Sequence, residues 1–297
     1  MSTPSIRFSI VVPMYNAAAT LARALQSLVD QDYPELEIIC VDGASTDSSM
    51  EIVSTFGDAI AAALSEPDEG QADALNKGFA LARGNVFGWL CADDELMPNT
   101  LHRVAEHLQS NQEVDILTGG CQRIFTGAGE HTTVPDHEYY VQLFIKNTIE
   151  QPSTFWRAET HRQVGPLSLE LKYAFDWEYW CRMKQRGARF MRTDDIYSVY
   201  YFSSTNLTST GGRKIADEMY RVIREYGPYN GKLAWAFAFL YRTYDLRGFY
   251  DTDAKHSRLA TLFFHLSLRT LYLFYDRTSV NLYNWNFASR QERGLSW

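Results

Sequence analysis

Cysteine is scarce in this sequence, and its spacing excludes two kinds of small scaffold. The chain has four cysteines: Cys40, Cys91, Cys121 and Cys181. They form no Cys-x-x-Cys pair and have no histidine at zinc-finger spacing, so neither a disulfide framework nor a zinc finger is expected. Isolated cysteines fit a reducing compartment. The N-terminus also lacks the basic and apolar stretches of a secretory signal, so we expect a cytoplasmic protein.

A long hydrophobic run is also missing. The nearest, Leu259–Tyr275, carries His265 and Arg269 in its middle. A membrane-spanning helix needs about 20 apolar residues without a central charge, so this segment is expected to be a buried or interfacial helix. Two interpretations of its aromatic stripe stay open, a core or protein interface and a membrane surface.

Basic residues are few in the first third of the chain. Residues 1–100 carry 4 Lys and Arg against 15 Asp and Glu, whereas residues 201–297 carry 13 against 8 and hold 21 of the 42 aromatic side chains. The acidic first third argues against a nucleic-acid partner, because neutralising phosphates needs a basic surface. The basic, aromatic tail is expected to contact a membrane surface or another chain, including a second copy of this one.

Several common catalytic motifs are absent. The sequence has no Gly-x4-Gly-Lys-Ser/Thr loop, no Gly-x-Gly-x-x-Gly after its first expected strand, no His-Glu-x-x-His, no Gly-x-Ser-x-Gly and no kinase signature. What is present is an ordinary globular composition, with 45% apolar and 22% charged residues in 297. That length supplies about two domains.

The first 118 residues alternate short apolar runs with segments of helical spacing. Strands are expected at Phe8–Val12, Glu37–Val41, Ile60–Leu64, Val86–Leu90 and Val114–Thr118. Helices are expected around Leu21–Leu28, after the capping residues Ser45 and Asp47, at Gln71–Arg83 and at Pro98–Leu108. This alternation predicts an α/β fold with a mostly parallel, Rossmann-like sheet flanked by helices.

Beyond Gly119 the pattern loosens into a turn-rich segment marked by Gly127, Gly129 and Pro135. A helix is expected at Asp176–Arg186 and a polar loop at Thr205–Gly212. Three further helices are expected at Lys214–Tyr226, Leu233–Tyr244 and Leu259–Tyr275. The C-terminal part is therefore expected to be a helical extension.

Carboxylates follow the expected strands at one edge of the sheet, where parallel α/β folds bind ligands. They are Asp42, Asp47, Glu66, Asp68, Asp93 and Asp94. Helix capping is the alternative explanation. It accounts for Asp47 but not for the consecutive Asp93 and Asp94, because one cap needs one carboxylate. Such a pair can hold Mg²⁺ or Mn²⁺ against a diphosphate.

Four segments in order carry a family resemblance: Phe8–Asn16, Val41–Asp47, Asn76–Gly78 and Leu90–Asp94. Together they resemble the family 2 inverting glycosyltransferases of GT-A fold, over about residues 6–200. The stretch from Ser65 to Gly78 is similar to bacterial enzymes that build surface polysaccharides.

The resemblance implies roles on the donor side. It places Pro13, Tyr15 and Asn16 at the nucleotide base, Asp42 as a hydrogen-bond acceptor for that base, and Asp73, Asn76 and Lys77 near the ribose, diphosphate or donor sugar. It also places Asp93 on ribose or sugar hydroxyls and makes Asp94 the ligand of Mn²⁺ or Mg²⁺. Taken singly, Pro13 is also a simple strand stop, and Asn76 and Lys77 a solvated helix face.

On the acceptor side, the resemblance makes Asp176 the general base. The alternative is a carboxylate that only stabilises a helix N-terminus. Gln151, Trp156, Trp177 and Trp180 are expected to line the acceptor site, although Trp156 also fits a core position. Many relatives carry a histidine ligand in the loop that corresponds to Tyr200–Gly212. That histidine is absent here, so the third metal ligand is left open, with Arg213 and Lys214 the nearest cations. All seven histidines of the chain are expected to be structural.

We therefore expect a glycosyltransferase domain at residues 1–212, with a nucleotide-sugar half at 1–118 and an acceptor half at 119–212, followed by a helical extension at 213–297. It would transfer a sugar from a nucleotide sugar, most often a UDP-sugar, to a saccharide or lipid-linked saccharide with inversion. The expected setting is bacterial surface glycan synthesis, in the cytoplasm or on the inner membrane face. A non-catalytic scaffold homologue and a nucleotidyltransferase are the alternatives.

Overall fold

The protein is described from a computed structural model that covers residues 5–125, 129–133, 143–202, 206–207, 213–236, 258–275 and 277. The chain divides into two compact units. The sheet unit comprises Met1–His137 and Ile149–Ser203, and the helical unit comprises Glu138–Thr148 and Ser204–Trp297. The chain passes between the units three times, after His137, after Thr148 and after Ser203, and the predicted domain boundary at residue 212 stays a prediction.

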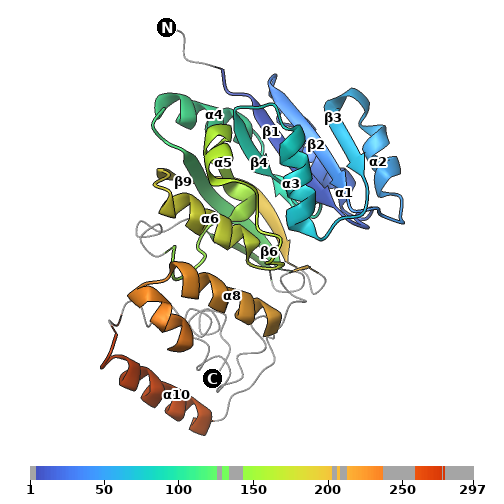
Figure 1. Ribbon diagram of the computed structural model, residues 1–297. Helices are drawn as coiled ribbons and strands as arrows, with labels where there is room; N and C mark the ends of the chain where they lie inside the picture. Colours follow the sequence, from blue (N-terminus) through green and yellow to red (C-terminus); the bar gives the residue numbers. More distant parts are fainter. Residues whose placement is uncertain are drawn as a thin grey trace. The chain divides into compact units, whose positions relative to one another are not determined.

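One sheet organises the first unit (Figure 1). Its strands are β1 (Phe8–Met14), β2 (Leu36–Asp42), β3 (Ile60–Ser65), β4 (Val86–Trp89), β5 (Glu95–Leu96), β6 (Ile116–Phe125), β7 (Gly129–Thr133), β8 (Thr154–Arg157) and β9 (Phe190–Phe202). Their order is β3-β2-β1-β4-β8-β6-β9-β5, and β7 pairs with β6.

The first four strands follow the expected parallel arrangement. β1 pairs in parallel with β2 and β4, and β2 with β3. The rest of the sheet is mixed: β8 runs antiparallel to β4 and β6, β7 to β6, and β5 to β9, while β6 and β9 are parallel. The expectation of a mostly parallel sheet is confirmed for the first half of this unit only.

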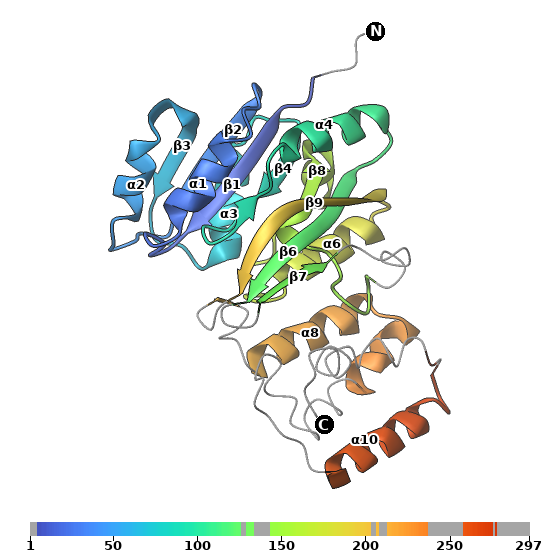
Figure 2. The ribbon, with the colours of Figure 1, turned by 180° about the vertical axis from the view of Figure 1, so that it is seen from behind.

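Helices cover both faces of the sheet. They are α1 (Leu21–Val29), α2 (Ser49–Thr55), α3 (Gln71–Leu81), α4 (Thr100–Ser110), α5 (Ala158–Val164) and α6 (Phe175–Gln185), with 3-10 turns η1 (Gly57–Ala59) and η2 (Gln151–Ser153). α3, α5 and α6 stand before the sheet in Figure 1, and α1 and α4 in Figure 2.

Alternation along β1 explains this layering. Ile10 and Val12 belong to the core cluster that also takes side chains from α1, α2 and α4. Val11 points to the opposite face, where α3 packs so closely that a Cβ on Gly78 would lie 2.4 Å from it. Buried parallel strands are apolar on both faces for this reason, and the run at Phe8–Met14 is completely buried.

The helical unit contains α8 (Arg213–Tyr226), η3 (Tyr229–Gly231) and α10 (Arg258–Leu271). The predicted helix at Lys214–Tyr226 is confirmed, and the one predicted at Leu259–Tyr275 ends earlier, at Leu271. Of the helix expected at Leu233–Tyr244, residues 233–236 are helical and the others lie outside the described residues. Most of the loop expected at Thr205–Gly212 lies outside them too.

Candidate active site

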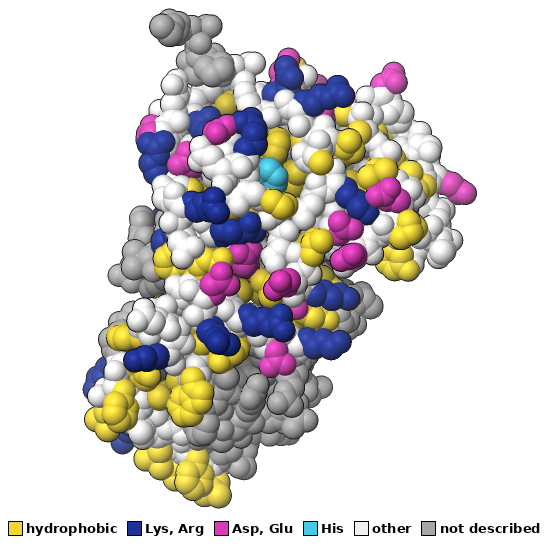
Figure 3. All heavy atoms as spheres, in the orientation of Figure 1, with side chains coloured by type: hydrophobic (Ala, Val, Ile, Leu, Met, Phe, Trp, Pro, Cys, Tyr) yellow, Lys and Arg dark blue, Asp and Glu magenta, His cyan; other side chains and the backbone are white. Residues whose placement is uncertain are grey.

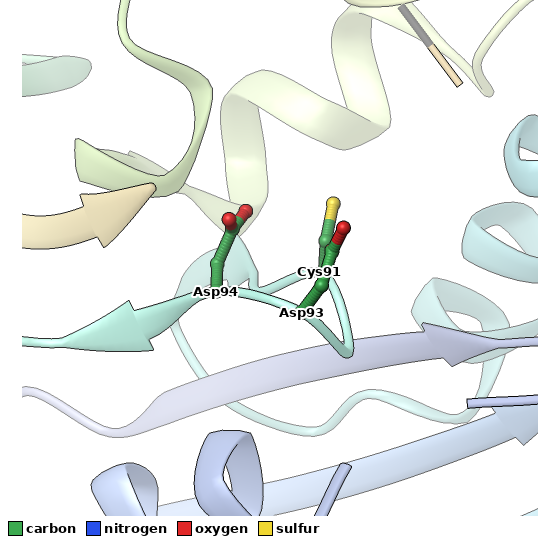
Figure 4. Close-up of side chains that lie close together, drawn as sticks. All are labelled: Cys91, Asp93 and Asp94. Atoms are coloured by element: carbon green, nitrogen blue, oxygen red, sulfur yellow. The ribbon is translucent and has the colours of Figure 1, made fainter. Parts of the chain in front are cut away.

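The turn after β4 gathers three side chains with metal-binding atoms. β4 ends at Trp89, and five residues follow before β5 begins at Glu95. One ligand atom from each of Cys91, Asp93 and Asp94 lies within 4.8 Å of the others. Figure 4 shows the three side chains rising from the same side of this turn. We call Leu90–Asp94 the acidic turn.

Asp94 is the most constrained member of the acidic turn. Its side chain is 1% exposed, and both carboxylate oxygens are enclosed without a well-formed hydrogen bond among the described residues. Burial, followed by the charge of Asp93, raises the pKa of Asp94 well above its usual value, and the nearby Cys91 thiol and Tyr201 backbone offset this only partly. Burial also raises the pKa of Asp93. A divalent cation would relieve both costs, so these residues fit a metal ion.

Arg23 of α1 holds the acidic turn in place. Its Nε lies 2.6 Å from Oε1 of Glu95, and a terminal N–H donates to the backbone carbonyl of Asp93 at 3.1 Å. The guanidinium also lies 3.8 Å from the ring centre of Tyr201, whose hydroxyl donates to the same Glu95 oxygen at 2.6 Å. The turn is therefore tied to α1 and to the end of β9. The Arg23 charge lowers the pKa of Asp93 and Asp94, against the effect of burial.

Hydrogen bonds through Cys91 connect α3 with η2. Nε2 of Gln71 donates to the Cys91 sulfur at 3.0 Å, and the thiol donates to Oε1 of Gln151 at 3.5 Å. Nε2 of Gln151 in turn donates to the Trp89 carbonyl at 2.9 Å. Gln151, predicted for the acceptor side, thus lies against the acidic turn.

Asp176 approaches the same thiol from α6. Burial is the main cause that raises the pKa of Cys91, but the charges of Asp94, Asp93 and Asp176 all contribute. Asp176 is the second residue of α6, where the helix N-terminus favours a negative charge. The backbone N–H of Trp177 donates to its Oδ1 at 2.6 Å. Carboxylates from two distant stretches of the chain, Asp93 with Asp94 and Asp176, therefore act on one thiol.

The ends of β1 and β2 form the neighbouring edge. Asn16 adopts a left-handed backbone (φ 48°) and binds the loop after β2, since its N–H donates to Ser45 Oγ at 2.7 Å and its Oδ1 accepts from the Thr46 N–H at 2.9 Å. Tyr15 is 65% exposed and Pro13 is buried in β1. Asp47, expected to cap, accepts from the Ser49 backbone N–H at 3.0 Å.

Asp42 is completely buried at the end of β2. Its carboxylate accepts hydrogen bonds from the Ser45 backbone N–H at 3.0 Å, from the Ser45 hydroxyl, and from the Ser65 hydroxyl at 2.6 Å. It holds the β2 and β3 ends together in this structure. Its predicted role toward a nucleotide base stays a prediction. Such a role requires the Ser45 or Ser65 hydroxyl to give up its hydrogen bond to one carboxylate oxygen.

The three donor-side residues of α3 are all engaged within the protein. Nζ of Lys77 lies 2.9 Å from Glu66 Oε1 and 3.2 Å from Asp73 Oδ2, and donates to the Pro67 carbonyl at 2.9 Å. Asn76 pairs with the backbone of Leu167 through both its amide groups, at 2.9 and 2.8 Å. Asn76 therefore fixes the segment before α6, and its contact with a donor stays a prediction.

The tryptophans predicted for the acceptor site are core residues. Trp156, Trp177 and Trp180 are at most 1% exposed. Trp180 stacks on Trp89 with ring centres 5.4 Å apart at 6°, and Trp156 meets both rings edge-on at 5.4 Å. They offer no face to a sugar in this structure, because all three are buried, with Trp156 and Trp180 inside the aromatic cluster. Direct stacking on an acceptor is thus disfavoured.

Sequence reasoning missed Arg23, Gln71 and Cys91 as parts of this site. Cys91 stands two residues before Asp93, and that spacing was the available signal. Arg23 gave no signal, since its partner Asp93 is 70 residues away along the chain. Of the histidines, His161 bonds the Tyr179 hydroxyl at 2.6 Å inside the aromatic cluster, in keeping with a structural role.

A Rossmann-like half-sheet, extended by mixed strands and carrying an acidic turn after its fourth strand, defines a GT-A glycosyltransferase. The model of glycosyl transferase family 2 matches residues 9–168, more than half of the chain. The protein belongs to this family and is a glycosyltransferase.

Named relatives agree. The chain is 29% identical over 210 residues to a PGL/p-HBAD biosynthesis glycosyltransferase of Mycobacterium bovis, covering 68% of this chain and 79% of the relative. It is 27% identical over 206 residues to an uncharacterized glycosyltransferase of Rickettsia typhi, covering 66% and 62%.

Solved structures share the fold. TarS 1–349 of S. aureus in complex with UDP-GlcNAc has a TM-score of 0.61 at 18% identity, over 89% of this chain and 80% of that one. The mannosyltransferase PcManGT of Pyrobaculum calidifontis, in complex with GDP-Man and Mn²⁺, has a TM-score of 0.53 at 19% identity, over 98% and 76%.

Proposed function

We propose that this glycosyltransferase moves a sugar from a nucleoside-diphosphate sugar to an acceptor hydroxyl with inversion at the anomeric carbon. The observation that carries the proposal is the cluster of Asp93 and Asp94 beside Cys91, on whose thiol the charge of Asp176 also acts. One carboxylate pair suits a cation and a diphosphate, and a separate carboxylate suits a proton acceptor. A direct displacement needs only that single base, whereas retention through a covalent intermediate needs a nucleophile in addition.

The donor side is formed by the ends of β1, β2 and α3. We assign Pro13, Tyr15, Asn16 and Asp42 to the nucleotide base, and Asp73, Asn76 and Lys77 to the ribose, diphosphate or sugar. UDP is the proposed nucleotide, as in the donor bound to TarS. GDP, present in the donor bound to PcManGT, is the alternative, and binding measurements with both nucleotides distinguish them.

Asp94 is proposed to hold the divalent cation, Mn²⁺ or Mg²⁺, and Asp93 to contact it or the donor hydroxyls. When bound, such an ion neutralises charge that builds on the departing diphosphate. PcManGT was solved with Mn²⁺. In this chain, the enclosed Asp94 oxygens support the assignment because burial disfavours their negative charge and a cation would offset that cost.

Asp176 is proposed to act as the base. Its carboxylate takes the proton of the acceptor hydroxyl while that oxygen forms a bond to the anomeric carbon. The bond from the anomeric carbon to the diphosphate oxygen breaks, and the nucleoside diphosphate leaves with the electron pair. The Trp177 N–H fixes one Asp176 oxygen, which orients the carboxylate. Gln151, beside the acidic turn, is proposed to orient the acceptor.

The proposed acceptor is a saccharide or lipid-linked saccharide of a bacterial surface glycan. The mycobacterial relative is named for PGL/p-HBAD biosynthesis, which supports glycan or glycolipid assembly as the setting. We infer a cytoplasmic protein that binds the inner membrane face.

The helical unit supports the membrane part of this proposal. No helix among the described residues is long and apolar enough to cross a bilayer. However, α10 exposes Leu259, Leu262, Phe263 and Leu266, at 46–64%, with helical spacing along one face. Figure 3 shows hydrophobic side chains gathered on the surface of this unit with Lys and Arg beside them. Because residues 201–297 are basic on balance, an anionic lipid surface is the partner we propose for this face.

Two variants test the catalytic proposal. Asp176→Asn is expected to lower transfer about a thousandfold, the usual order for loss of a general base, while nucleotide binding stays within twofold. Asp94→Asn is expected to lose cation-dependent nucleotide binding. The measurements are thermal shifts with UDP, GDP, CDP and dTDP, with and without Mn²⁺, and NMR of the anomeric configuration of the product.

The exposed carboxylate of Asp194 provides the matched control. Among the described residues, its carboxylate forms an ion pair with Arg192, two residues away, at 2.8 Å. Asp194→Asn is therefore expected to leave both transfer and nucleotide binding unchanged. Full activity of Asp176→Asn would remove the base from its role, and a product with retained configuration would overturn the inverting mechanism.

A further inference from the structure

The sulfur of Cys91 lies beside the carboxylates of Asp93 and Asp94 in the acidic turn. Its Sγ and one oxygen from each of Asp93 and Asp94 lie within 4.8 Å of one another (Figure 4). In tetrahedral geometry, zinc–sulfur and zinc–oxygen bonds of about 2.3 and 2.1 Å put two ligand atoms of one ion about 3.5 Å apart. A shift of less than about 1 Å in each side chain therefore closes all three atoms onto one ion.

An independent observation points into the same space. Both oxygens of Asp94 are enclosed and lack a well-formed hydrogen bond among the described residues, although the side chain is 1% exposed. Buried carboxylates without partners are costly unless a cation pairs with them. The cluster is thus more than a set of exposed acids, because the protein keeps a fully buried carboxylate without a well-formed hydrogen bond beside the thiol.

One contact of the sulfur would stabilise a metal-bound thiolate. Nε2 of Gln71 donates to Sγ at 3.0 Å, and a donated hydrogen bond stabilises a metal-bound sulfur from outside the ligand set. The thiol proton points to Oε1 of Gln151 at 3.5 Å, the longer of the two contacts. The positive charge of Arg23, held on the Asp93 carbonyl at 3.1 Å, offsets the negative charge of three anionic ligands.

We propose that Cys91 is a third protein ligand of the divalent cation at Asp93 and Asp94, which makes this site prefer sulfur-binding cations over Mg²⁺. The inference rests on the proposed metal site at Asp94 and adds the sulfur to it. On binding, the cysteine S–H bond breaks, its proton passes to solvent, and the thiolate forms the bond to the cation. Thiolate ligands favour Zn²⁺, Co²⁺ and Cd²⁺, whereas Mg²⁺ requires oxygen ligands.

Cobalt absorption tests the sulfur directly, without an assay of transfer. The full chain is titrated with Co²⁺, and the near-ultraviolet charge-transfer band of a cobalt–thiolate bond is recorded. Wild type is expected to show the band with one Co²⁺ per chain. Cys91→Ser is expected to lose the band, to keep weaker Co²⁺ binding by calorimetry, and to lose at least about tenfold in its preference for Cd²⁺ over Mg²⁺. Cys181→Ala, a buried cysteine of α6, is the matched control and is expected to keep the band.

The outcomes separate this inference from the proposed function. Co²⁺ binding to wild type without the band overturns the Cys91 ligand and leaves the Asp94 site standing. No Co²⁺ binding to wild type overturns both. An unchanged band in Cys91→Ser assigns the sulfur elsewhere and also overturns the inference. Since the wild-type spectrum needs no variant, poor folding of Cys91→Ser does not remove the test, and Cys91→Ala serves as the second variant.

Discussion

The two units of this chain use aromatic and large apolar side chains in opposite ways. In the sheet unit, Trp89, Trp156 and Trp180 are at most 3% exposed and pack against one another. In the helical unit, Trp235 is 65% exposed, and Phe274 is 73% exposed. The aromatic surplus of the sequence therefore has two different explanations.

The difference separates the unit that carries the candidate active site from the unit that carries the proposed membrane contact. The buried cluster packs behind β4 and α6, and these elements carry the acidic turn and Asp176. Its packing holds the elements that carry the candidate active site in position. The apolar side chains on one face of α10 stay exposed among the described residues, so this face is available for contact with another surface. Matched changes in the two units should therefore have different consequences.

The largest expected effect is on stability. Trp180→Ala opens a cavity in the aromatic cluster and is expected to cost about 3–5 kcal/mol of unfolding free energy in the sheet unit. Trp235→Ala is the matched change in the helical unit and is expected to cost less than about 1 kcal/mol, because its side chain is largely exposed. Urea unfolding followed by circular dichroism measures both. Equal losses in the two variants would contradict the comparison.

A smaller effect is expected on membrane binding. The double change Leu262→Asp with Phe263→Asp removes two exposed apolar side chains of α10. It is expected to weaken binding to phosphatidylglycerol-containing vesicles at least about tenfold, or 1.4 kcal/mol, with transfer to a water-soluble acceptor unchanged. Vesicle co-sedimentation at low and high salt measures this, since salt screens the basic contribution.

The control for this change lies in the sheet unit. Leu169 is 50% exposed, and Leu169→Asp is expected to leave vesicle binding as in wild type. Loss of dimerisation instead of vesicle binding, seen by light scattering of the α10 variant, would assign this face to a second copy of the chain. Unchanged vesicle binding would contradict the membrane proposal.

Local pattern was enough to predict the first half of the sheet. β1, β2, β3 and β4 begin within one residue of their predicted starts, because each is a short apolar run. β1 continues through Pro13, its expected stop, to Met14. The thirteen-residue strand Phe190–Phe202 was missed. Its buried and exposed residues do not alternate, and its register with β6 shifts at Thr118 and Gly120. The sequence therefore lacks the two-residue alternation by which a strand is recognised.

The candidate site divides in the same way. The rule that ligands bind at the carboxyl ends of parallel strands is sufficient to predict Asp42, Asp93 and Asp94 at one edge of the sheet. Trp177 and Trp180 were expected at the acceptor because they flank Asp176, the predicted base, but both are buried in α6. Contacts between distant segments, such as Arg23 with Glu95 and Tyr201, depend on tertiary packing that no local pattern encodes.

The smallest expected effect is a pH dependence of the buried cluster. Burial, with the charges of Arg182 and Arg162, lowers the pKa of His161 from 6.5 to about 4, and its ring bonds the Tyr179 hydroxyl. Between pH 6.5 and about 4, His161 binds a proton in the unfolded chain but not in the folded protein. Stability therefore falls as pH drops from about 6.5 towards 4, with no further loss from this group below that range.

His161→Phe isolates this contribution. The ring stays aromatic among Phe79 and Phe87, but it no longer titrates. The stability lost between pH 7.5 and pH 5 is expected to be about 1 kcal/mol smaller in the variant than in wild type, a figure reduced for partial exposure of the side chain. Urea unfolding at the two pH values gives the difference, in which all other titrating groups cancel. An identical pH dependence would mean that His161 accepts a proton in the folded protein, so that burial does not keep charge out of the aromatic cluster.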